Sequence, residues 1–435
     1  MSKSSFSRRK FLSTSLLTTV GLSSIPAMTF ANASSSKIID SGQVRLGFIG
    51  VGRQAMGLLN NMMKNPLVEV VAGADIYKIK LERFKQRVAK NYQERNQESP
   101  AVSLYDDYKK LLENPEVDAV VIASPDHWHA LMAIDACHAG KDIYLEKPLT
   151  FTIKEGQELV KAVRSNGTVL AVGSMQRSGA NFQHAVRMVQ KGNLGKISEV
   201  LVNVGTPANP KPYDLPAQPV PEGLDWNSWV GPLPDIHYNE ELNPPISLNP
   251  EENEKMWGAW RWYQETGGGL MTDWGAHMVD IAQWGLGMDR NGPSEIIPAS
   301  DSNPLTYYYS NGIKMHITPF DEGRQGVKFF GEKGWIKVSR GQYDTNVASC
   351  ERKFSNEETS FGAHHVDFID SILKRKDPVV PVEIGHSTCT ACTLGNIAAK
   401  LGRPLKWDPN TQEFIDDFEA NTQLHYVYQN GYSLG

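Results

Sequence analysis

The chain has only four cysteines among its 435 residues: Cys137, Cys350, Cys389 and Cys392. Four unevenly spaced cysteines exclude a disulfide-bonded scaffold. Cys389 and Cys392 form a lone C-x-x-C within residues 388–401, where the apolar spacing predicts a helix. A metal site needs a second pair of ligands and a redox motif needs a thioredoxin-like context. We therefore interpret the two thiols as small buried residues and predict no metal site.

Acidic residues are missing from the chain up to Phe30. Arg8 and Arg9 precede an apolar run over residues 16–30, and small residues follow at 31–33. This pattern predicts a twin-arginine signal peptide over residues 1–33, cleaved after Ala33, and a periplasmic protein. No later apolar run is long enough to span a bilayer, so we expect no stable membrane anchor after cleavage.

The chain also has no excess of positive charge, because its formal net charge is -5 at pH 7. Removal of the basic signal peptide makes the mature chain more negative still, so nucleic acid is not an expected partner. Hydrophobic residues make up 40% and charged residues 21%, which is typical of a globular protein that folds in water. The length predicts two or three domains.

From residue 44 onward, short β-branched runs alternate with longer helical stretches. The pattern predicts strands at 44–49, 68–74, 118–123, 142–145 and 168–172, and helices at 56–64, 78–97, 129–139 and 153–165. Because parallel strands need crossover helices, this alternation predicts an α/β fold with a doubly wound parallel sheet. We place this Rossmann domain at 44–173, after a linker at 34–43, and expect its ligand at the carboxyl ends of the strands.

The first expected strand ends in a glycine-rich turn of the form G-x-G-x-x-A, with Gly50, Gly52 and Ala55. Such glycines allow a tight turn and a close approach of backbone to a pyrophosphate. Asp75 ends the next strand, where its carboxylate can accept hydrogen bonds from ribose hydroxyls and would repel a 2′-phosphate. We therefore predict NAD over NADP, and Lys78 is the residue that could reverse this preference. The cofactor-binding residues expected here are Gly50, Val51, Gly52, Arg53, Gln54 and Asp75.

Two further expected strands end in polar residues that would face the same crevice. They are Ser124, Pro125, Asp126 and His129 after the run at 118–123, and Glu146, Lys147 and Pro148 after the run at 142–145. A lysine on the floor of such a crevice is partly desolvated, so its charge interacts strongly with a substrate hydroxyl. An isolated Glu-Lys-Pro is also compatible with an exposed, salt-bridged turn. The position at a strand end favours the crevice.

Beyond residue 174, consecutive strands and turns replace the alternating pattern. Runs at 197–204, 305–309, 313–318, 326–330 and 335–338 predict a large, mostly antiparallel sheet in an α+β domain over 174–430. Residues 206–250 hold eleven of the twenty-five prolines, which excludes a continuous helix there. We expect an irregular insertion rich in proline and tryptophan at 206–262. Its tryptophans serve either packing or sugar binding, and we assign Trp262 to the substrate.

Three glycines at 267–269 precede Asp273 and His277. The glycines predict a helix entry where backbone closely approaches a ligand. A spacing of four places Asp273 and His277 on one helix face. A carboxylate beside an imidazole would fix its tautomer and make His277 a competent proton acceptor. Such pairs also occur as ordinary surface contacts, so this assignment depends on a crevice facing the helix.

The chain resembles the glucose-fructose oxidoreductase and inositol dehydrogenase family (Gfo/Idh/MocA) over residues 44–430. The resemblance lies in Gly50-x-Gly52-x-x-Ala55, Asp126-His127-x-His129, Glu146-Lys147-Pro148 and Asp273-x-x-x-His277. It implies that Lys147 is the catalytic lysine, that Asp273 and His277 are the acid-base pair, and that all three contact substrate. It further implies cofactor contacts by Glu146, Lys147 and Gln176, a substrate contact by Arg177, and a homodimer or homotetramer.

The resemblance implies an NAD(P)-dependent oxidoreductase that acts on a secondary hydroxyl of a sugar, glycoside or polyol. Since free NAD is scarce outside the cytoplasm, we expect a tightly held cofactor. An NAD-dependent glycoside hydrolase that oxidises, eliminates, hydrates and reduces is an alternative without net redox change. A non-catalytic sugar-binding protein is a third, which the retained Lys147, Asp273 and His277 disfavour. The motifs look more like those of dehydrogenases.

Overall fold

The computed structural model describes residues 42–249, 257–321 and 323–434. The expected signal peptide and residues 34–41 of the expected linker lie outside the described residues. Within these ranges no helix is long and apolar enough to cross a membrane.

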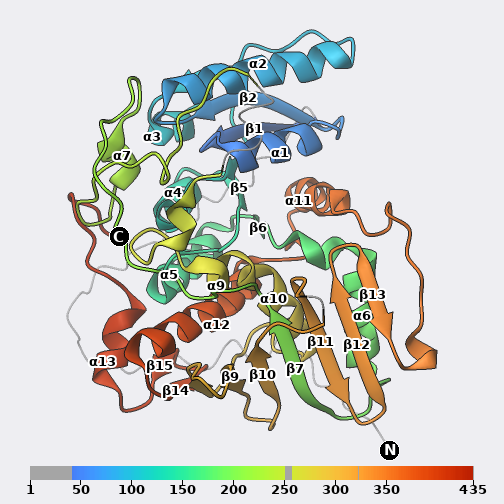
Figure 1. Ribbon diagram of the computed structural model, residues 1–435. Coiled ribbons are helices and arrows are strands. Elements are labelled where there is room, and N and C mark those ends of the chain that lie inside the picture. Colours follow the sequence, from blue (N-terminus) through green and yellow to red (C-terminus); the bar gives the residue numbers. More distant parts are fainter. Residues whose placement is uncertain (1–41, 250–256, 322, 435) are drawn as a thin grey trace, which may run out of the picture. The chain divides into compact units, whose positions relative to one another are not determined.

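A six-stranded parallel sheet forms the first half of the described chain (Figure 1). Its order is β3-β2-β1-β4-β5-β6, with every neighbouring pair parallel. The strands are β1 (Val44–Ile49), β2 (Val68–Ala74), β3 (Ser103–Tyr105), β4 (Ala119–Ile122), β5 (Asp142–Leu145) and β6 (Leu170–Val172). The order reverses between β1 and β4, which is where a doubly wound sheet opens a ligand crevice. The predicted parallel sheet is confirmed, and only the three-residue strand β3 was not predicted.

Helices pack on both faces of this sheet. They are α1 (Arg53–Met62), α2 (Lys78–Glu94), α3 (Tyr108–Leu112), η1 (Asp126–Trp128), α4 (His129–His138) and α5 (Ile153–Asn166). The buried side chains of α1 and α2 share one core with β1, and those of α4 and α5 share another with β4. Helix α5 begins at a capping box formed by Thr152 and Glu155, and it ends at Gly167 with φ of 63°.

The second half is built on a nine-stranded sheet of order β13-β12-β11-β7-β10-β9-β8-β14-β15. All its pairs are antiparallel except β7 with β10, which confirms the prediction of a mostly antiparallel sheet. The strands are β7 (Ile197–Asn203), β8 (Glu295–Ile297), β9 (Leu305–Tyr308), β10 (Lys314–Ile317), β11 (Gly326–Gly331), β12 (Gly334–Ser339), β13 (Gln342–Thr345), β14 (Leu405–Asp408) and β15 (Glu413–Phe414).

The helices of the second half cover one face of this sheet and also return to the first half. They are η2 (Met175–Ser178), α6 (Ala180–Gln190), α9 (Gly269–Asp273), α10 (Gly275–Gly285), η4 (Ala348–Cys350), α11 (Gly362–Lys374), α12 (Val382–Leu401), α13 (Phe418–Asn421) and η5 (Thr422–Leu424). Helix α11 adds Phe368 and Ile369 to the core beside β1. Cys389 and Cys392 are buried in α12, and burial raises the pKa of Cys389 to about 11. These thiols are structural.

The insertion is irregular apart from α7 (Trp226–Val230) and the short η3 (Ala259–Trp262). It has a small apolar core of its own, in which Trp226 and Trp229 stack with ring centroids 4.4 Å apart. Both rings are buried. Packing therefore accounts for these two tryptophans, and sugar binding does not.

Candidate active site

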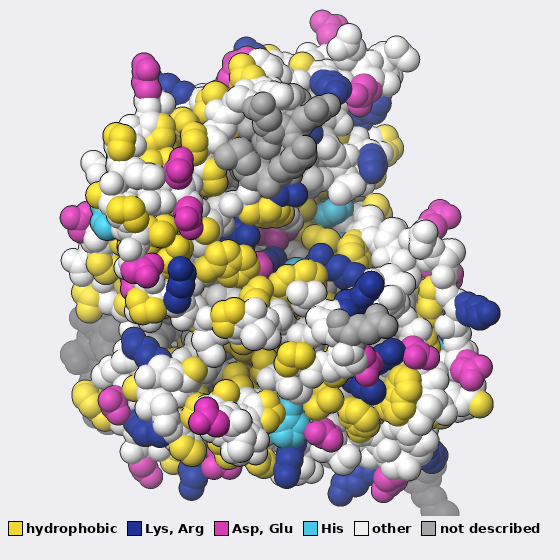
Figure 2. All heavy atoms as spheres, viewed as in Figure 1, with side chains coloured by type: hydrophobic (Ala, Val, Ile, Leu, Met, Phe, Trp, Pro, Cys, Tyr) yellow, Lys and Arg dark blue, Asp and Glu magenta, His cyan; other side chains and the backbone are white. Residues whose placement is uncertain are grey.

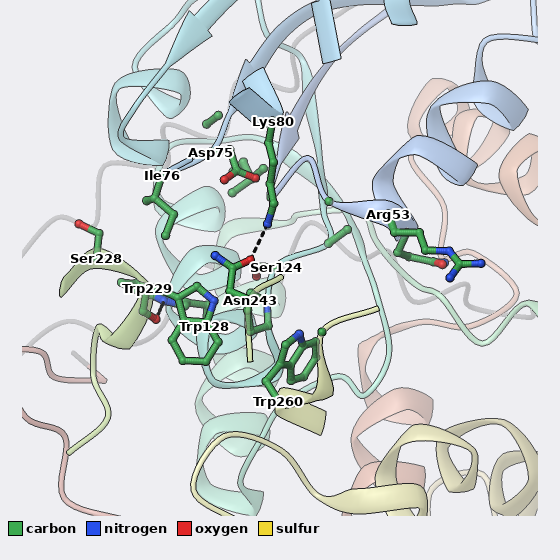
Figure 3. A pocket seen from close by; sticks show the side chains of 18 of the residues that line it. Arg53, Asp75, Ile76, Lys80, Ser124, Trp128, Ser228, Trp229, Asn243 and Trp260 are labelled. Atoms are coloured by element: carbon green, nitrogen blue, oxygen red, sulfur yellow. Dashed lines mark hydrogen bonds between the residues drawn. The ribbon is translucent and has the colours of Figure 1, made fainter. Parts of the chain in front are cut away.

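A pocket lies at the carboxyl ends of β1, β2 and β4 (Figure 3). Gly50 has φ of 76°, and a Cβ atom there would meet the Ser124 backbone nitrogen at 2.8 Å. A Cβ on Gly52 would meet no atom within 4 Å, so the space beside this glycine is open. Helix α1 starts directly afterwards at Arg53, so its unpaired backbone N–H groups lie at the pocket. The turn is therefore shaped to hold an anion against backbone.

Asp75 lies in this pocket with its carboxylate held by backbone. Its Oδ2 accepts a hydrogen bond from the Val51 N–H at 2.9 Å, and its Oδ1 accepts one from the Tyr77 N–H at 3.0 Å. Each oxygen keeps a lone pair for a ribose hydroxyl. Lys80 points into the pocket beside Asp75 and donates to Asn243 Oδ1 at 2.8 Å (Figure 3). Lys78 is exposed and does not line the pocket, so the relevant cation is Lys80.

The strand-end loops are tied together by His129 and Glu146. The ring nitrogens of His129 lie 2.7 Å from the Pro148 carbonyl oxygen and 3.0 Å from that of Ser124. Burial lowers the pKa of His129 to about 4. Glu146 accepts hydrogen bonds from Gln54 Nε2 at 2.8 Å and from the backbone N–H of Lys147 at 3.2 Å. These contacts position the glycine-rich turn and the lysine relative to each other.

A second cleft adjoins the first pocket and contains the predicted catalytic groups. It shares Gln54, Ser124 and Arg261 with that pocket, and Lys147, Asp273 and His277 line it. Lys147 Nζ donates to Asp273 Oδ1 at 2.6 Å, although the two residues are 126 positions apart. Figure 2 shows a hollow in this face of the molecule, with charged and histidine side chains inside it. The structure thus brings together the three side chains that the sequence analysis had selected from opposite halves.

The prediction that the Asp273 carboxylate pairs with the His277 imidazole is wrong. Asp273 ends α9, Trp274 separates it from α10, and the Asp273 carboxylate binds Lys147 instead of the imidazole. Burial acts to raise the pKa of Asp273, but the neighbouring cations Lys147 and Arg261 lower it overall. The competing partner is an ammonium group from the other half of the chain, which helix spacing alone cannot reveal.

His277 is buried, and its Nδ1 has no hydrogen-bond partner among the described residues. Burial holds its pKa well below the ordinary value, and the positive charges of Lys147 and Arg340 act in the same direction. The imidazole is therefore neutral at neutral pH and can accept a proton. This buried nitrogen is therefore available to a molecule bound in the cleft.

Arg177 and Gln176 lie beside the cleft and do not line it. The Arg177 guanidinium is buried and binds Asp280 at 2.8 Å and Asp289 at 2.7 Å. The predicted substrate contact of Arg177 is therefore wrong, because its donors are engaged within the protein. Gln176 is fully buried, and neither atom of its amide has a partner among the described residues. The adjacent Met175 does line the cleft.

The glycines at 267–269 do not line the cleft, and two of them admit the backbone of the insertion instead, which corrects the prediction for them. A Cβ on Gly267 would meet the Arg261 Cα at 2.7 Å, and one on Gly269 would meet the Pro210 nitrogen at 2.6 Å. The insertion therefore packs directly against the start of α9. This close approach places residues 257–262 over the cleft, where Trp257, Trp260 and Trp262 line it.

Three further residues line the cleft: Asp126, which was expected to face the crevice but had no assigned role, and Arg261 and Arg340, which were not predicted. Asp126 is only 3% exposed, its carboxylate has no hydrogen bond with a described residue, and burial raises its pKa well above the ordinary value. Its place in the loop after β4 is the sequence signal behind that expected position. Arg261 and Arg340 come from the insertion and from a strand turn, where no local pattern marks them.

The residues present fit a dinucleotide cofactor. Gly52 leaves space for a pyrophosphate, Asp75 offers acceptors, and the buried Ser124 Oγ has no partner among the described residues. In the same ranges, no three His, Cys, Asp or Glu side chains lie close enough to hold a metal ion.

Both halves of the chain match models of one protein family. Residues 44–174 match the model of the Gfo/Idh/MocA oxidoreductase family, NAD-binding Rossmann fold. Residues 178–434 match the model of the same oxidoreductase family's C-terminal alpha/beta domain.

Relatives and solved structures agree with this assignment. The chain is 32% identical over 382 residues to the uncharacterized oxidoreductase YrbE of Bacillus subtilis (strain 168), which covers 83% of this chain and 92% of that protein. A glycosyl hydrolase family 109 protein of Shewanella sp. (strain ANA-3) is 29% identical over 207 residues, 44% of each chain. The WlbA dehydrogenase of Chromobacterium violaceum, solved with NADH and UDP-GlcNAcA, has the same fold, with a TM-score of 0.60 and 18% identity over 85% of this chain and 97% of that one.

The position of Asp75 predicts a specific effect on cofactor preference. Replacing Asp75 with asparagine removes the negative charge and half of its acceptor capacity, so NADH affinity should fall about 10- to 100-fold. NADPH affinity should rise relative to NADH, because the nearby Lys80 is no longer opposed by a carboxylate. Fluorescence titration of cofactor-free protein with each nucleotide measures the ratio.

Lys78→Gln is the matched control, since Lys78 is exposed and outside the pocket. It should leave both affinities unchanged. If the Asp75→Asn protein kept the wild-type ratio of NADH to NADPH affinity, Asp75 would not be the ribose-binding acid.

Proposed function

Because the chain belongs to the Gfo/Idh/MocA family of NAD-binding oxidoreductases, we propose that it oxidises a secondary hydroxyl of a sugar, glycoside or polyol. The observation that carries this proposal is the contact of Lys147 with Asp273 in a cleft that His277 also lines. This cleft opens onto the dinucleotide pocket through shared wall residues. A cation and a neutral base thus lie beside the cofactor site, as alcohol oxidation requires.

Each side chain has a distinct task in the proposed reaction. Lys147 Nζ donates a hydrogen bond to the substrate oxygen and stabilises the negative charge that develops there. Asp273 holds the ammonium in place. His277 accepts the hydroxyl proton on its neutral ring. The nicotinamide of bound NAD supplies the hydride acceptor.

We further propose that the cofactor is held tightly, because the insertion covers its pocket. Ser228, Trp229, Asn243 and Trp260 of the insertion form one wall of the pocket, and Lys80 bonds to Asn243 across it (Figure 3). Release of the dinucleotide would require this wall to move away from the sheet. Tight retention suits an enzyme that works where free NAD is scarce.

An NAD-dependent glycoside hydrolase is the second candidate, and the family 109 relatives favour it. Oxidation of a ring hydroxyl makes the neighbouring C–H acidic, so that the aglycone can be eliminated before water adds and the ketone is reduced. A leaving aglycone needs a proton donor. Asp126 supports this candidate, because burial raises its pKa and so favours the protonated carboxyl, and it faces the same cleft.

We also propose that the protein is exported by the twin-arginine pathway and that it self-associates. Export rests on the Arg8-Arg9 motif and the apolar run after it. A homodimer or homotetramer is supported by the face of the nine-stranded sheet opposite its helices. Partly exposed side chains such as Leu201 and Phe330 lie on that face, while their neighbours Val200 and Phe329 are buried on the helix side.

Variants of the two central residues test the proposed oxidation. Lys147→Met and His277→Ala should each lower hydride transfer by about 100- to 10,000-fold, since each removes a group needed in the transition state. NADH affinity should change little, which also shows that the variants fold. Lys154→Met, whose lysine pairs with Glu158 outside the cleft, is the control and should be fully active. Wild-type turnover by either cleft variant would contradict the proposed roles.

A panel of sugars and glycosides separates the two candidate reactions. For an oxidoreductase, each molecule of sugar oxidised reduces one NAD, seen as a rise in NADH absorbance of the protein as purified. For a glycoside hydrolase, aglycone is released over many turnovers without net NADH. Aglycone release of that kind would replace the first proposal with the second.

Replacing both Arg8 and Arg9 with lysine tests export. The double variant should stay in the cytoplasmic fraction, because the twin-arginine pathway reads the guanidinium pair. Wild-type protein from the periplasmic fraction should begin at Ser34 by N-terminal sequencing. Lys3→Arg is the control and should be exported. Undiminished export of the double variant would exclude this pathway.

A further inference from the structure

Arg340 lies in the turn between β12 and β13 and reaches the candidate active site from the sheet of the second half. It lines the same cleft as Lys147 and His277. Its guanidinium carbon is 4.6 Å from the centre of the Trp274 ring and 5.7 Å from that of Phe361. Aromatic faces therefore position this cation, and its N–H edges stay free for another partner.

No acidic side chain pairs with Arg340 in the described part of the chain. Asp273 and Glu146 exert the nearest negative charges on it. Asp273 is engaged by Lys147 at 2.6 Å, and Glu146 is engaged by Gln54 at 2.8 Å. The Arg340 side chain is exposed, and partial desolvation at the cleft still lowers the pKa of its guanidinium. An anion bound in the cleft would give this cation an ion-pair partner.

The phosphates of the cofactor are not the expected partner of Arg340. Their expected place is the glycine-rich turn and the start of α1, in the neighbouring pocket. That pocket has its own cations, Arg53, Lys80 and Arg83, and Arg340 does not line it. Arg340 instead acts on the charge state of His277, the proposed proton acceptor. The free guanidinium therefore faces the substrate.

We propose that the substrate is an acidic sugar whose carboxylate binds Arg340 while a ring hydroxyl lies between Lys147 and His277. This inference rests on the proposed function, because it names the class of sugar that the same cleft accepts. A planar guanidinium matches a carboxylate through two parallel hydrogen bonds. One unpaired guanidinium balances the single charge of a carboxylate, whereas a phosphate monoester carries about -1.5 to -2 at pH 7.

Direct binding to the protein loaded with NADH tests this inference without requiring turnover. Titration calorimetry would compare glucuronate with glucose and galacturonate with galactose, with glucose 6-phosphate as a further arm. Wild-type protein should bind at least one hexuronate about 10- to 100-fold more tightly than its neutral partner. Arg340→Gln should remove this preference and leave the affinity for the neutral sugar within about threefold.

Arg352→Gln is the matched control. Arg352 is also stacked on a ring, that of Phe354 at 4.6 Å, but it lies outside the cleft. It should keep the hexuronate preference. The inference is overturned if wild-type protein binds no hexuronate, if acid and neutral sugars bind equally, or if Arg340→Gln weakens both alike. Tighter binding of glucose 6-phosphate than of glucuronate would overturn the choice of a carboxylate.

The same protein distinguishes a failure of this inference from a failure of the proposed function. NAD-loaded protein that oxidises neutral sugars, and binds hexuronates no better, keeps the function and refutes the inference. Hexuronate binding that depends on Arg340, without NADH formation or aglycone release, supports the acidic ligand and refutes the proposed chemistry.

Discussion

The contact between Lys147 and Asp273 is the interaction on which the site depends. It joins the loop after β5 of the parallel sheet to the end of α9 in the other half, and both side chains are largely buried. Removing Asp273 would leave the Lys147 ammonium without its carboxylate partner in a largely buried place, which is more costly than losing a surface ion pair. The ammonium is thereby fixed in the cleft that His277 also lines.

Burial then sets the charge states around this ion pair. It raises the pKa of Asp126 and Glu146 and lowers that of His277, since a low-dielectric environment disfavours each charged form. Asp273 remains ionised because cations surround it. The cleft thus combines one fixed ion pair with groups that hold or accept protons, and this combination suits proton movement at an alcohol.

The insertion contributes residues to both the pocket and the cleft. Its own core contains the stacked Trp226 and Trp229, so it is an ordered wall that does not depend on the sheets alone. The glycines before α9 let its backbone approach closely, and Arg261 then lies within 3.9 Å of Asp273. A proline-rich segment that binds neither sheet as a strand can therefore shape both the pocket and the cleft.

The local elements of this protein follow from its sequence alone: the alternating strands and helices, the turn at Gly50, the acid at Asp75 and the strand-end lysine. These depend on spacing and on residue type over a few positions, which the chain carries without reference to its fold. The partners of the charged side chains, in contrast, depend on the folded chain. Arg177 pairs with Asp280 and not with substrate, Asp273 pairs with Lys147 and not with His277, and Arg340 reaches the cleft from a distant turn. Ion pairs and buried contacts form between groups that are far apart in sequence, and no local pattern encodes which groups will meet.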